Sequence, residues 1–118
     1  MTYSKGQMED EITKAIIHWE KEYKGRGPTE AKTDILRNMV IVNLKGILAP
    51  AECYLAQNKD GMALIKKLRQ QLVERGRPEL EGIINRVTSA NVISLHTDIS
   101  TKTGERIFVF VLDKEFLA

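Results

Sequence analysis

The sequence predicts an α+β domain in which two β-hairpins form an antiparallel sheet, with about three helices packed mainly on one face. Three observations lead to this fold class. Hydrophobic residues follow a helical period before residue 25, alternate with a period of two after a turn at Arg37-Asn38, and alternate again near the C-terminus. The resulting order is α-β-β-α-α-β-β, and hairpins separated by helices are typical of an antiparallel sheet with a helical layer.

The first helix is predicted over residues 6–24. Lys21 and Lys24 lie in its last turn and acidic residues lie in its first turns, an order that the helix dipole favours. The helix should end at Gly25-Arg26-Gly27-Pro28, because glycine accepts a positive φ and proline cannot continue the helical hydrogen bonds. Its predicted core stripe, with spacings of three and four, is Met8, Ile12, Ala15, Ile16, Trp19 and Tyr23.

The first hairpin is predicted over residues 31–44. Val40, Val42 and Leu44 share one side of an alternating run, which indicates a strand. Residues 31–36 form a weaker strand candidate, and Arg37-Asn38 supplies turn residues that join the two.

Two helices are predicted between the hairpins. Pro50 suits the first turn of one, and Gly61 implies either a bend near residues 58–61 or a packing contact that overrides the cost of glycine. Gly76-Arg77-Pro78 is expected to separate the second helix from the third, which should close at residues 89–91. The predicted core stripes are Tyr54, Leu55, Met62, Ile65, Leu68 and Leu72 in the second helix, and Leu80, Ile83, Ile84 and Val87 in the third.

The second hairpin is predicted to join residues 91–99 to residues 106–112 through a polar loop. Its last strand is apolar on both sides, with Phe108, Phe110 and Leu112 on one and Ile107, Val109 and Val111 on the other. Helices in a two-layer domain cover one side, so the second row needs a wrapped helix, a second copy or another protein. We expect a homo-oligomer, with a strand buried inside its own monomer as the alternative.

Composition limits the class of protein. The chain has 118 residues, of which 42% are hydrophobic, and this fits a single domain over residues 1–118. A net charge of +2 does not by itself indicate a protein that binds nucleic acid or a membrane surface. The single cysteine fits a reducing cytoplasm, and the N-terminal residues lack the apolar core of a secretory leader. We therefore expect a cytoplasmic protein without a transmembrane segment.

A small hydrolase is one functional alternative. Cys53, His96 and Asp98 would supply a nucleophile, a base and an orienting carboxylate if the fold brought them together. The blander interpretation is that Cys53 packs as a small hydrophobic side chain, because no glycine-rich elbow flanks it. With one cysteine and two histidines no structural metal site is expected, so we assign no catalytic, cofactor-binding or metal-binding residue.

A KH-like RNA-binding or ribosome-associated module is the other alternative. Residues 59–77 carry six basic and two acidic side chains, the most basic stretch of the chain, and the element order resembles that of one KH class. However, the Gly-x-x-Gly clamp of that fold is missing. A solvated helix face explains the same charges, so nucleic acid is not the expected partner.

Four runs of the sequence carry a family resemblance that spans nearly the whole chain: Lys24-Gly25-Arg26-Gly27-Pro28, Met39 to Leu48 with Pro50 and Glu52 after it, Arg77-Pro78-Glu79-Leu80, and above all Thr97 to Arg106. These runs resemble the small prokaryotic MpsC-like proteins. The polar segment from Asp98 to Arg106 and the turn from Gly25 to Pro28 match best. This resemblance implies a non-catalytic accessory of a sodium-translocating, membrane-potential-generating system, bound to membrane transport subunits and peripheral at the membrane through them.

A partner-contact surface is expected where the matching loops lie, because recognition residues are often on loops held by a rigid scaffold. The alternative is that these residues merely shape turns. The expected contact residues are Arg26, Asp98, Thr103, Glu105 and Arg106, together with Phe108 and Phe110 of the last strand.

Overall fold

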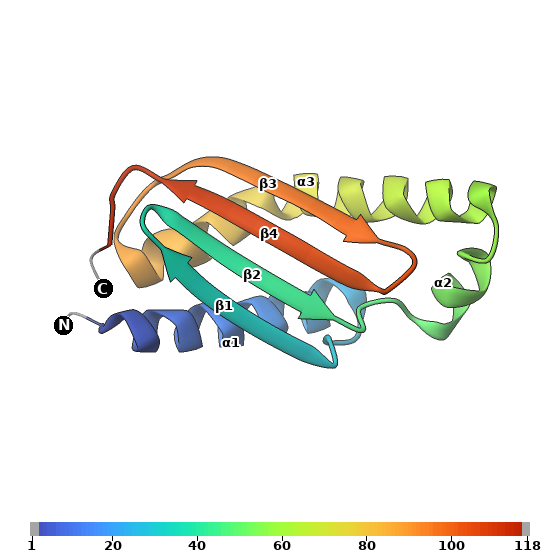
Figure 1. Cartoon of the computed structure of the whole chain (residues 1–118), viewed down its shortest axis with the longest axis horizontal. Coiled ribbons are helices and arrows are strands. Elements are labelled where there is room, and N and C mark those ends of the chain that lie inside the picture. The colour runs from blue at the N-terminus through green and yellow to red at the C-terminus, as the bar shows by residue number, and fades with distance from the viewer. Residues whose placement is uncertain (1–2, 117–118) are drawn as a thin grey trace.

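The computed structural model describes residues 3–116, which form three helices and four strands (Figure 1). The predicted order α-β-β-α-α-β-β is confirmed. The strands make one antiparallel sheet in the order β1-β2-β4-β3, so the two hairpins meet along β2 and β4. The elements are α1 (Lys5–Lys24), β1 (Glu30–Leu36), β2 (Met39–Lys45), α2 (Pro50–Leu55), α3 (Lys59–Thr88), β3 (Val92–Ser100) and β4 (Glu105–Leu112).

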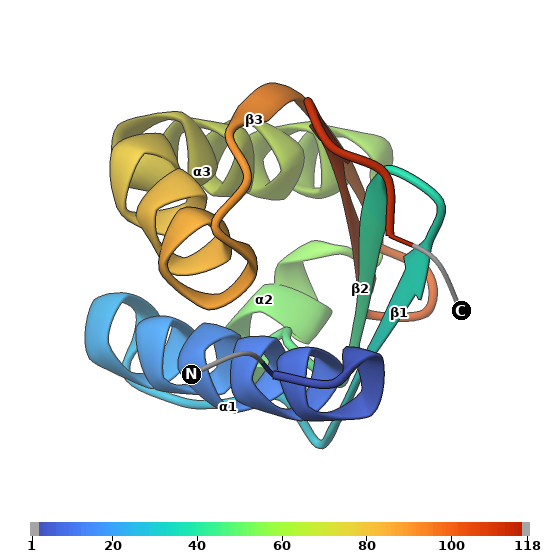
Figure 2. The same ribbon diagram turned by 90° about the vertical axis from the view of Figure 1, so that its left-hand side faces the viewer.

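The helices α1 and α3 lie on the same side of the sheet, which confirms the two-layer arrangement (Figure 2). The hydrophobic core fills the space between these layers. The strand residues that face the helices include Ile35 of β1, Val40, Val42 and Leu44 of β2, and Phe108, Phe110 and Leu112 of β4; Ile12, Ile16, Trp19, Ile65, Leu80 and Ile84 meet them from the helices.

Local sequence explains the ends of α1 and the first turn. Ser4 caps α1 by accepting a hydrogen bond from the Gln7 amide, and Gly25 ends the helix with a φ of 80°. Arg37 takes a φ of 57° in the tight turn between β1 and β2. These positions agree with the predicted helix end and hairpin turn.

The break between α2 and α3 lies at residues 56–58, at the edge of the region where Gly61 predicted a bend. Asn58 begins α3 by accepting a hydrogen bond from the Gly61 amide at 2.8 Å. A Cβ atom on Gly61 would lie 1.7 Å from the carbonyl oxygen of Leu55. Only glycine fits at this position, because the backbone of α3 touches the backbone at the end of α2 there.

The predicted helix boundary at Gly76-Arg77-Pro78 is wrong, because α3 continues through it to Thr88. Gly76 is a buried packing position against Trp19 of α1. Pro78 is an interior helix residue, and the C-terminal part of α3 runs at an angle to the rest (Figure 1). Close packing of two helices has overridden the local breaking preference of the glycine and the proline.

The core stripe predicted for the second helix is also wrong in part. Ile65 is buried, whereas Tyr54, Leu55 and Leu68 are 72%, 42% and 51% exposed. The side of α3 that faces the core carries Gly61, Ile65, Arg69, Val73 and Gly76. Small and charged residues thus occupy buried positions that the hydrophobic pattern assigns to leucine.

Among the described residues, no helix combines the length and the apolar character that crossing a bilayer requires.

Candidate functional site

A cleft of about 390 Å³ lies between α3 and the edge strand β3. Side chains of α3 from Lys66 to Arg77 form one wall, and residues 95–99 of β3 form the other. Arg106, from the neighbouring strand β4, also lines it. We call this hollow the α3–β3 cleft.

Arg106 is buried in this cleft with only 2% of its surface exposed. Its Nη1 donates a hydrogen bond to Thr97 Oγ1 at 2.7 Å, and Thr97 in turn donates to the Ile107 carbonyl. Its Nε is buried without a hydrogen-bond partner, and within the described residues no carboxylate lies within ion-pair distance. Burial lowers the pKa of Arg106 to about 10, so the guanidinium remains charged at neutral pH.

Asp98 lies at the edge of the cleft in an exposed position. Its Oδ1 accepts the Ile99 amide at 2.8 Å and lies 3.5 Å from Lys66 Nζ. The hydrogen bond from the Ile99 amide lowers its pKa most, burial opposes this effect, and the Lys66 charge lowers the pKa further, so that the net shift is downward. Asp98 is therefore a charged rim residue that links β3 to α3.

Lys24 and Glu20 of α1 form a buried ion pair near Arg106. The two side chains lie 2.9 Å apart, and 3% and 2% of their surfaces are exposed. Burial lowers the pKa of Lys24 to about 8, although Glu20 counteracts the shift. The Lys24 ammonium also lies 4.9 Å from the centre of the Trp19 ring.

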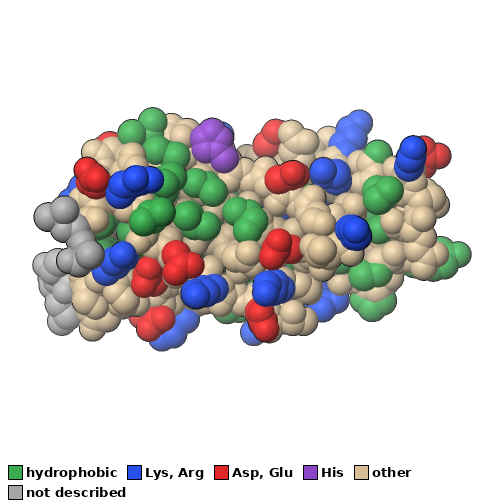
Figure 3. All heavy atoms as spheres, viewed as in Figure 1, with side chains coloured by type: hydrophobic (Ala, Val, Ile, Leu, Met, Phe, Trp, Pro, Cys, Tyr) green, Lys and Arg blue, Asp and Glu red, His purple; other side chains and the backbone are tan. Residues whose placement is uncertain are grey.

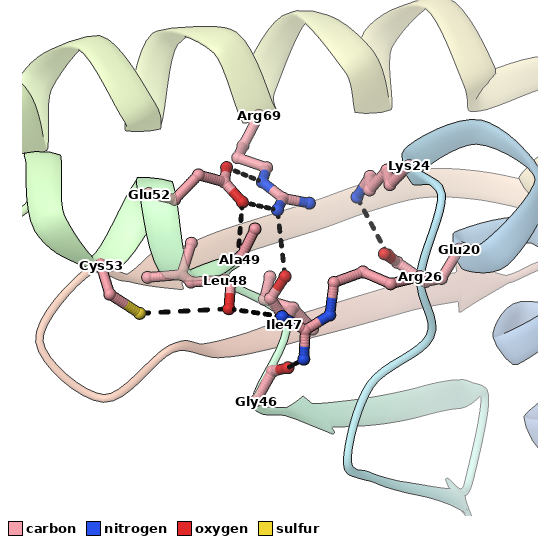
Figure 4. A network of polar contacts seen from close by, with 10 residues as sticks. All are labelled: Glu20, Lys24, Arg26, Gly46, Ile47, Leu48, Ala49, Glu52, Cys53 and Arg69. Atoms are coloured by element: carbon pink, nitrogen blue, oxygen red, sulfur yellow. Dashed lines mark hydrogen bonds and ion pairs between the residues drawn. The ribbon is translucent and has the colours of Figure 1, made fainter.

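Arg69 joins α3 to α2 and to the segment that follows β2 (Figure 4). Its Nε donates to Glu52 Oε2 at 2.9 Å, and its Nη2 donates to Glu52 Oε1 and to the Ile47 carbonyl. Burial raises the pKa of Glu52, but the hydrogen bonds from Arg69 and the Ala49 amide outweigh it and lower the pKa overall. The Nη1 of Arg69 has no partner and is buried.

These side chains influence one another electrostatically, since the charges of Glu20 and Arg69 both act on Arg106, and those of Arg69 and Arg106 both act on Lys24. The result is a group of ionised side chains between the helices and the sheet. We call it the buried charge cluster: Glu20, Lys24, Glu52, Arg69 and Arg106.

Arg106 is the one member of the buried charge cluster that the sequence analysis placed among the expected contact residues. Glu20 lies four residues after Ile16, and Arg69 lies four residues after Ile65, so both occupy core positions of their helices. A charged residue at a core position of a helical stripe was the available signal. Glu52 gave no such signal, because its partner comes from another helix.

Arg26 is half-buried and binds its own chain. Its Nη1 donates to the Leu48 carbonyl at 3.1 Å and its Nη2 to the Gly46 carbonyl at 3.4 Å (Figure 4). The side chain therefore holds the segment after β2 against the end of α1.

The β3–β4 turn carries two of the other expected contact residues. Thr103 is exposed in the turn, and its amide donates to Ser100 Oγ. Glu105 is half-buried and accepts a hydrogen bond from Asn43 across the sheet. Thr103 is free to contact a partner, whereas Glu105 already has an internal one.

Phe108 and Phe110 face the helices and are fully buried in their own subunit, so the predicted contact of these two side chains with a partner is corrected. The apolar row that reaches the surface is the opposite one. It covers the two central strands on the side away from the helices, and we call it the open face: Met39 and Ile41 of β2 with Ile107, Val109 and Val111 of β4.

The open face has polar borders. Residues paired with it on the edge strands include Asp34 of β1 and His96 and Asp98 of β3. Apolar side chains gather over the sheet with charged groups around them (Figure 3). An apolar centre inside a polar rim is the usual anatomy of a protein interface.

The hydrolase alternative requires three side chains in one site, but the structure places Cys53 apart from His96 and Asp98, which both line the α3–β3 cleft. Cys53 is exposed on α2 beside Leu48 and the turn residues 101–104. His96 lies at the α3–β3 cleft, where its Nε2 is 3.1 Å from Ser94 Oγ. The described residues contain no group of three or more His, Cys, Asp or Glu side chains arranged to hold a metal ion.

Part of the basic helix face on which the RNA-binding alternative depends is not available to a ligand. Arg69 is buried, and Lys66 and Arg77 form ion pairs with Asp98 and Glu81. The segment around Gly76 is continuous helix and cannot act as a clamp loop.

Comparison with known proteins gives one family and two relatives. Residues 4–114 match the model of the family described as "Na+-translocating membrane potential-generating system (MpsC)". The chain is 54% identical over 112 residues to "Uncharacterized protein YbcI" of Bacillus subtilis (strain 168), covering 95% of this chain and 90% of that protein. It is 26% identical over 107 residues to "Uncharacterized protein YrhF" of the same organism, covering 89% and 87%. No solved structure gives a significant match.

Proposed function

The chain belongs to the MpsC family, and from this premise we propose that it is a non-catalytic interaction subunit of a Na+-translocating, membrane-potential-generating system. The chain's role in this proposal is to dock onto a membrane subunit that carries the transport chemistry. The family description supports the choice of this system, and the apolar surface of the sheet supports the proposed place of contact.

The observation that carries the docking role is the open face. Ile41 and Val109 pair directly across the two central strands, and Met39 pairs with Val111 beside them. These side chains are half-buried by their neighbours, and no helix or strand within residues 3–116 forms a second layer over them (Figure 2). Covering such a row removes apolar surface from water at about 25 cal/mol per Å², which favours association.

A capture experiment from native membranes tests the proposal. The tagged chain is expressed from its own promoter, and the variant Val109→Glu places a carboxylate in the open face. Gln71→Glu adds the same charge to the exposed side of α3 and serves as the matched control. Circular dichroism confirms that each variant is folded.

We expect the parent chain and Gln71→Glu to retain an integral membrane protein of a Na+-translocating system, and Val109→Glu to lose it. Recovery of no such protein above the level of the tag alone would overturn the proposed function. Equal recovery with Val109→Glu would show that docking does not use the open face.

Self-association through the open face is the competing use of this surface. Sedimentation of the purified chain at micromolar concentration measures it directly. An oligomer that Val109→Glu dissociates would assign the open face to a second copy, and a monomer would remove the homo-oligomer hypothesis.

A further inference from the structure

The buried charge cluster contains one more cation than it has carboxylates. Lys24 is paired with Glu20, and Arg69 is paired with Glu52. Arg106 has no acidic partner within ion-pair distance in the described part of the chain, although only 2% of its surface is exposed. Burying a charge without a partner costs free energy, and a bound anion beside Arg106 would offset that cost.

The unpaired guanidinium is located where an anion can reach it. Arg106 lines the α3–β3 cleft, which has a volume of about 390 Å³. Its Nη1 is fixed by Thr97, and this hydrogen bond leaves Nε as a buried donor without an acceptor. A buried donor of this kind is unusual in folded proteins and marks a missing acceptor.

The charges around the cleft favour a singly charged anion. Lys66 and Arg77 line it together with Asp98 and Glu74, so the four charges at its walls cancel and Arg106 supplies the surplus of one. A monoanion neutralises that surplus. A phosphate dianion would exceed it and would be repelled by the two carboxylates.

The walls also include apolar side chains. Val73 of α3 and Ile99 of β3 are buried, and Leu95 lies half-buried along the same strand. A ligand with a short hydrocarbon part would contact these residues while its charged end meets Arg106. Carboxylates are planar monoanions that match the guanidinium geometry.

We propose that the α3–β3 cleft binds a carboxylate with a short apolar tail, held by Arg106 at its charged end. The carboxylate belongs either to a small organic acid or to the C-terminus of a peptide, and both present the same group to the guanidinium. This site lies at the side of α3 and is independent of docking through the open face.

The test uses nuclear magnetic resonance of the intact chain, with butyrate as the probe at constant ionic strength. Butyramide has the same size and lacks the charge, so it is the matched ligand control. A peptide ending in Val-Val with a free C-terminus tests the second source, and the same peptide with an amidated C-terminus is its control. Inorganic phosphate tests the preference for charge.

We expect butyrate to shift the Arg106 Nε–H resonance and the amides of Thr97 and Ile99, and butyramide to leave them unchanged. Tighter binding of the free-acid peptide would identify a polypeptide as the source of the carboxylate, and preference for butyrate would identify a small acid. Phosphate binding without butyrate binding would overturn the proposal, as would equal shifts with butyramide.

Two variants locate the site. Arg106→Gln should weaken butyrate binding by at least about tenfold, because a charge-assisted pair is lost. Lys67→Gln changes an exposed lysine of α3 that does not line the cleft, and should bind as the parent does. If Arg106→Gln does not fold, the Nε–H resonance of the parent chain still decides the question, and undiminished binding by a folded Arg106→Gln would overturn the proposal.

Discussion

Gly76 of α3 lies against the indole ring of Trp19 on α1, and a Cβ atom on Gly76 would come within 2.4 Å of Trp19 Cζ2. The two helices therefore approach each other at a distance that only glycine allows. This contact explains why a glycine persists inside a long helix. It also fixes how α1 and α3 lie together over the sheet.

Gly76→Ala should destabilise the protein, because the new methyl group must displace a buried indole. Overpacking costs typically about 1–3 kcal/mol, and the better helix propensity of alanine offsets about 1 kcal/mol of it. The free energy of unfolding in urea measures the difference. Replacing the indole by a smaller side chain in Trp19→Leu should reduce the cost of Gly76→Ala in the double variant.

Gly82→Ala is the matched control in the same helix. Nothing lies within 4 Å of a Cβ atom at this position, and the residue is exposed. Alanine should therefore stabilise the chain by up to about 1 kcal/mol. A stabilising Gly76→Ala would contradict the packing role of this glycine.

The Arg69–Glu52 pair predicts an asymmetric response to mutation. Glu52→Gln leaves a guanidinium that is 5% exposed without its counter-charge, whereas Arg69→Met leaves a carboxylate that is 17% exposed and closer to water. Breaking a buried pair from one side costs about 3–5 kcal/mol, so we expect the larger loss from Glu52→Gln. Urea unfolding of both single variants and the double variant measures it, and additive losses would argue against direct coupling.

Lys24 predicts a rise in stability at alkaline pH. Its pKa is about 8 in the folded chain, against an ordinary 10.5 in the unfolded one. Between these values the unfolded chain binds a proton that the folded chain has released, so the free energy of unfolding increases with pH. The contribution of this residue should grow by about 1–3 kcal/mol from below pH 8 to about pH 10.

The comparison that isolates Lys24 is with Lys24→Met. The variant leaves Glu20 unpaired and should be less stable at neutral pH, and it lacks the rise between about pH 8 and pH 10. Tyr23, whose pKa is raised to about 12 by its hydrogen bond to Glu79, is present in both chains and cancels in the difference. Parallel pH profiles for the two chains would refute the assignment.

The fold could be predicted because its periodic elements are strong. The stripe of α1 and the alternation in β2 and β4 reflect burial on one side, which the sequence pattern reports directly. The course of α3 could not be predicted, because the reason for Gly76 is a ring from another helix. Tertiary contact decided the boundary, and local propensity gave the opposite answer.

The site was less predictable than the fold for a related reason. Arg106 and Asp98 were correctly placed on one hairpin, and Asp98 reaches a lysine of α3 that no local pattern connects to it. The pairing of Arg69 with Glu52 likewise depends on two helices that meet only in the folded chain. Buried charges follow from three-dimensional pairing, which alternation of polar and apolar residues does not encode.

Two neighbouring side chains of α3 provide the sharpest contrast between pattern and packing. Ile65 is 2% exposed, and Leu68, three residues later, is 51% exposed. Ile65→Ala should cost about 2–5 kcal/mol by leaving a cavity in the core. Leu68→Ala should change the free energy of unfolding by no more than about 0.5 kcal/mol, because the side chain already meets water and alanine favours the helix. If Leu68→Ala lowered the free energy of unfolding as much as Ile65→Ala, Leu68 would be a core residue. The face of α3 that bears Arg69 would then not point inward.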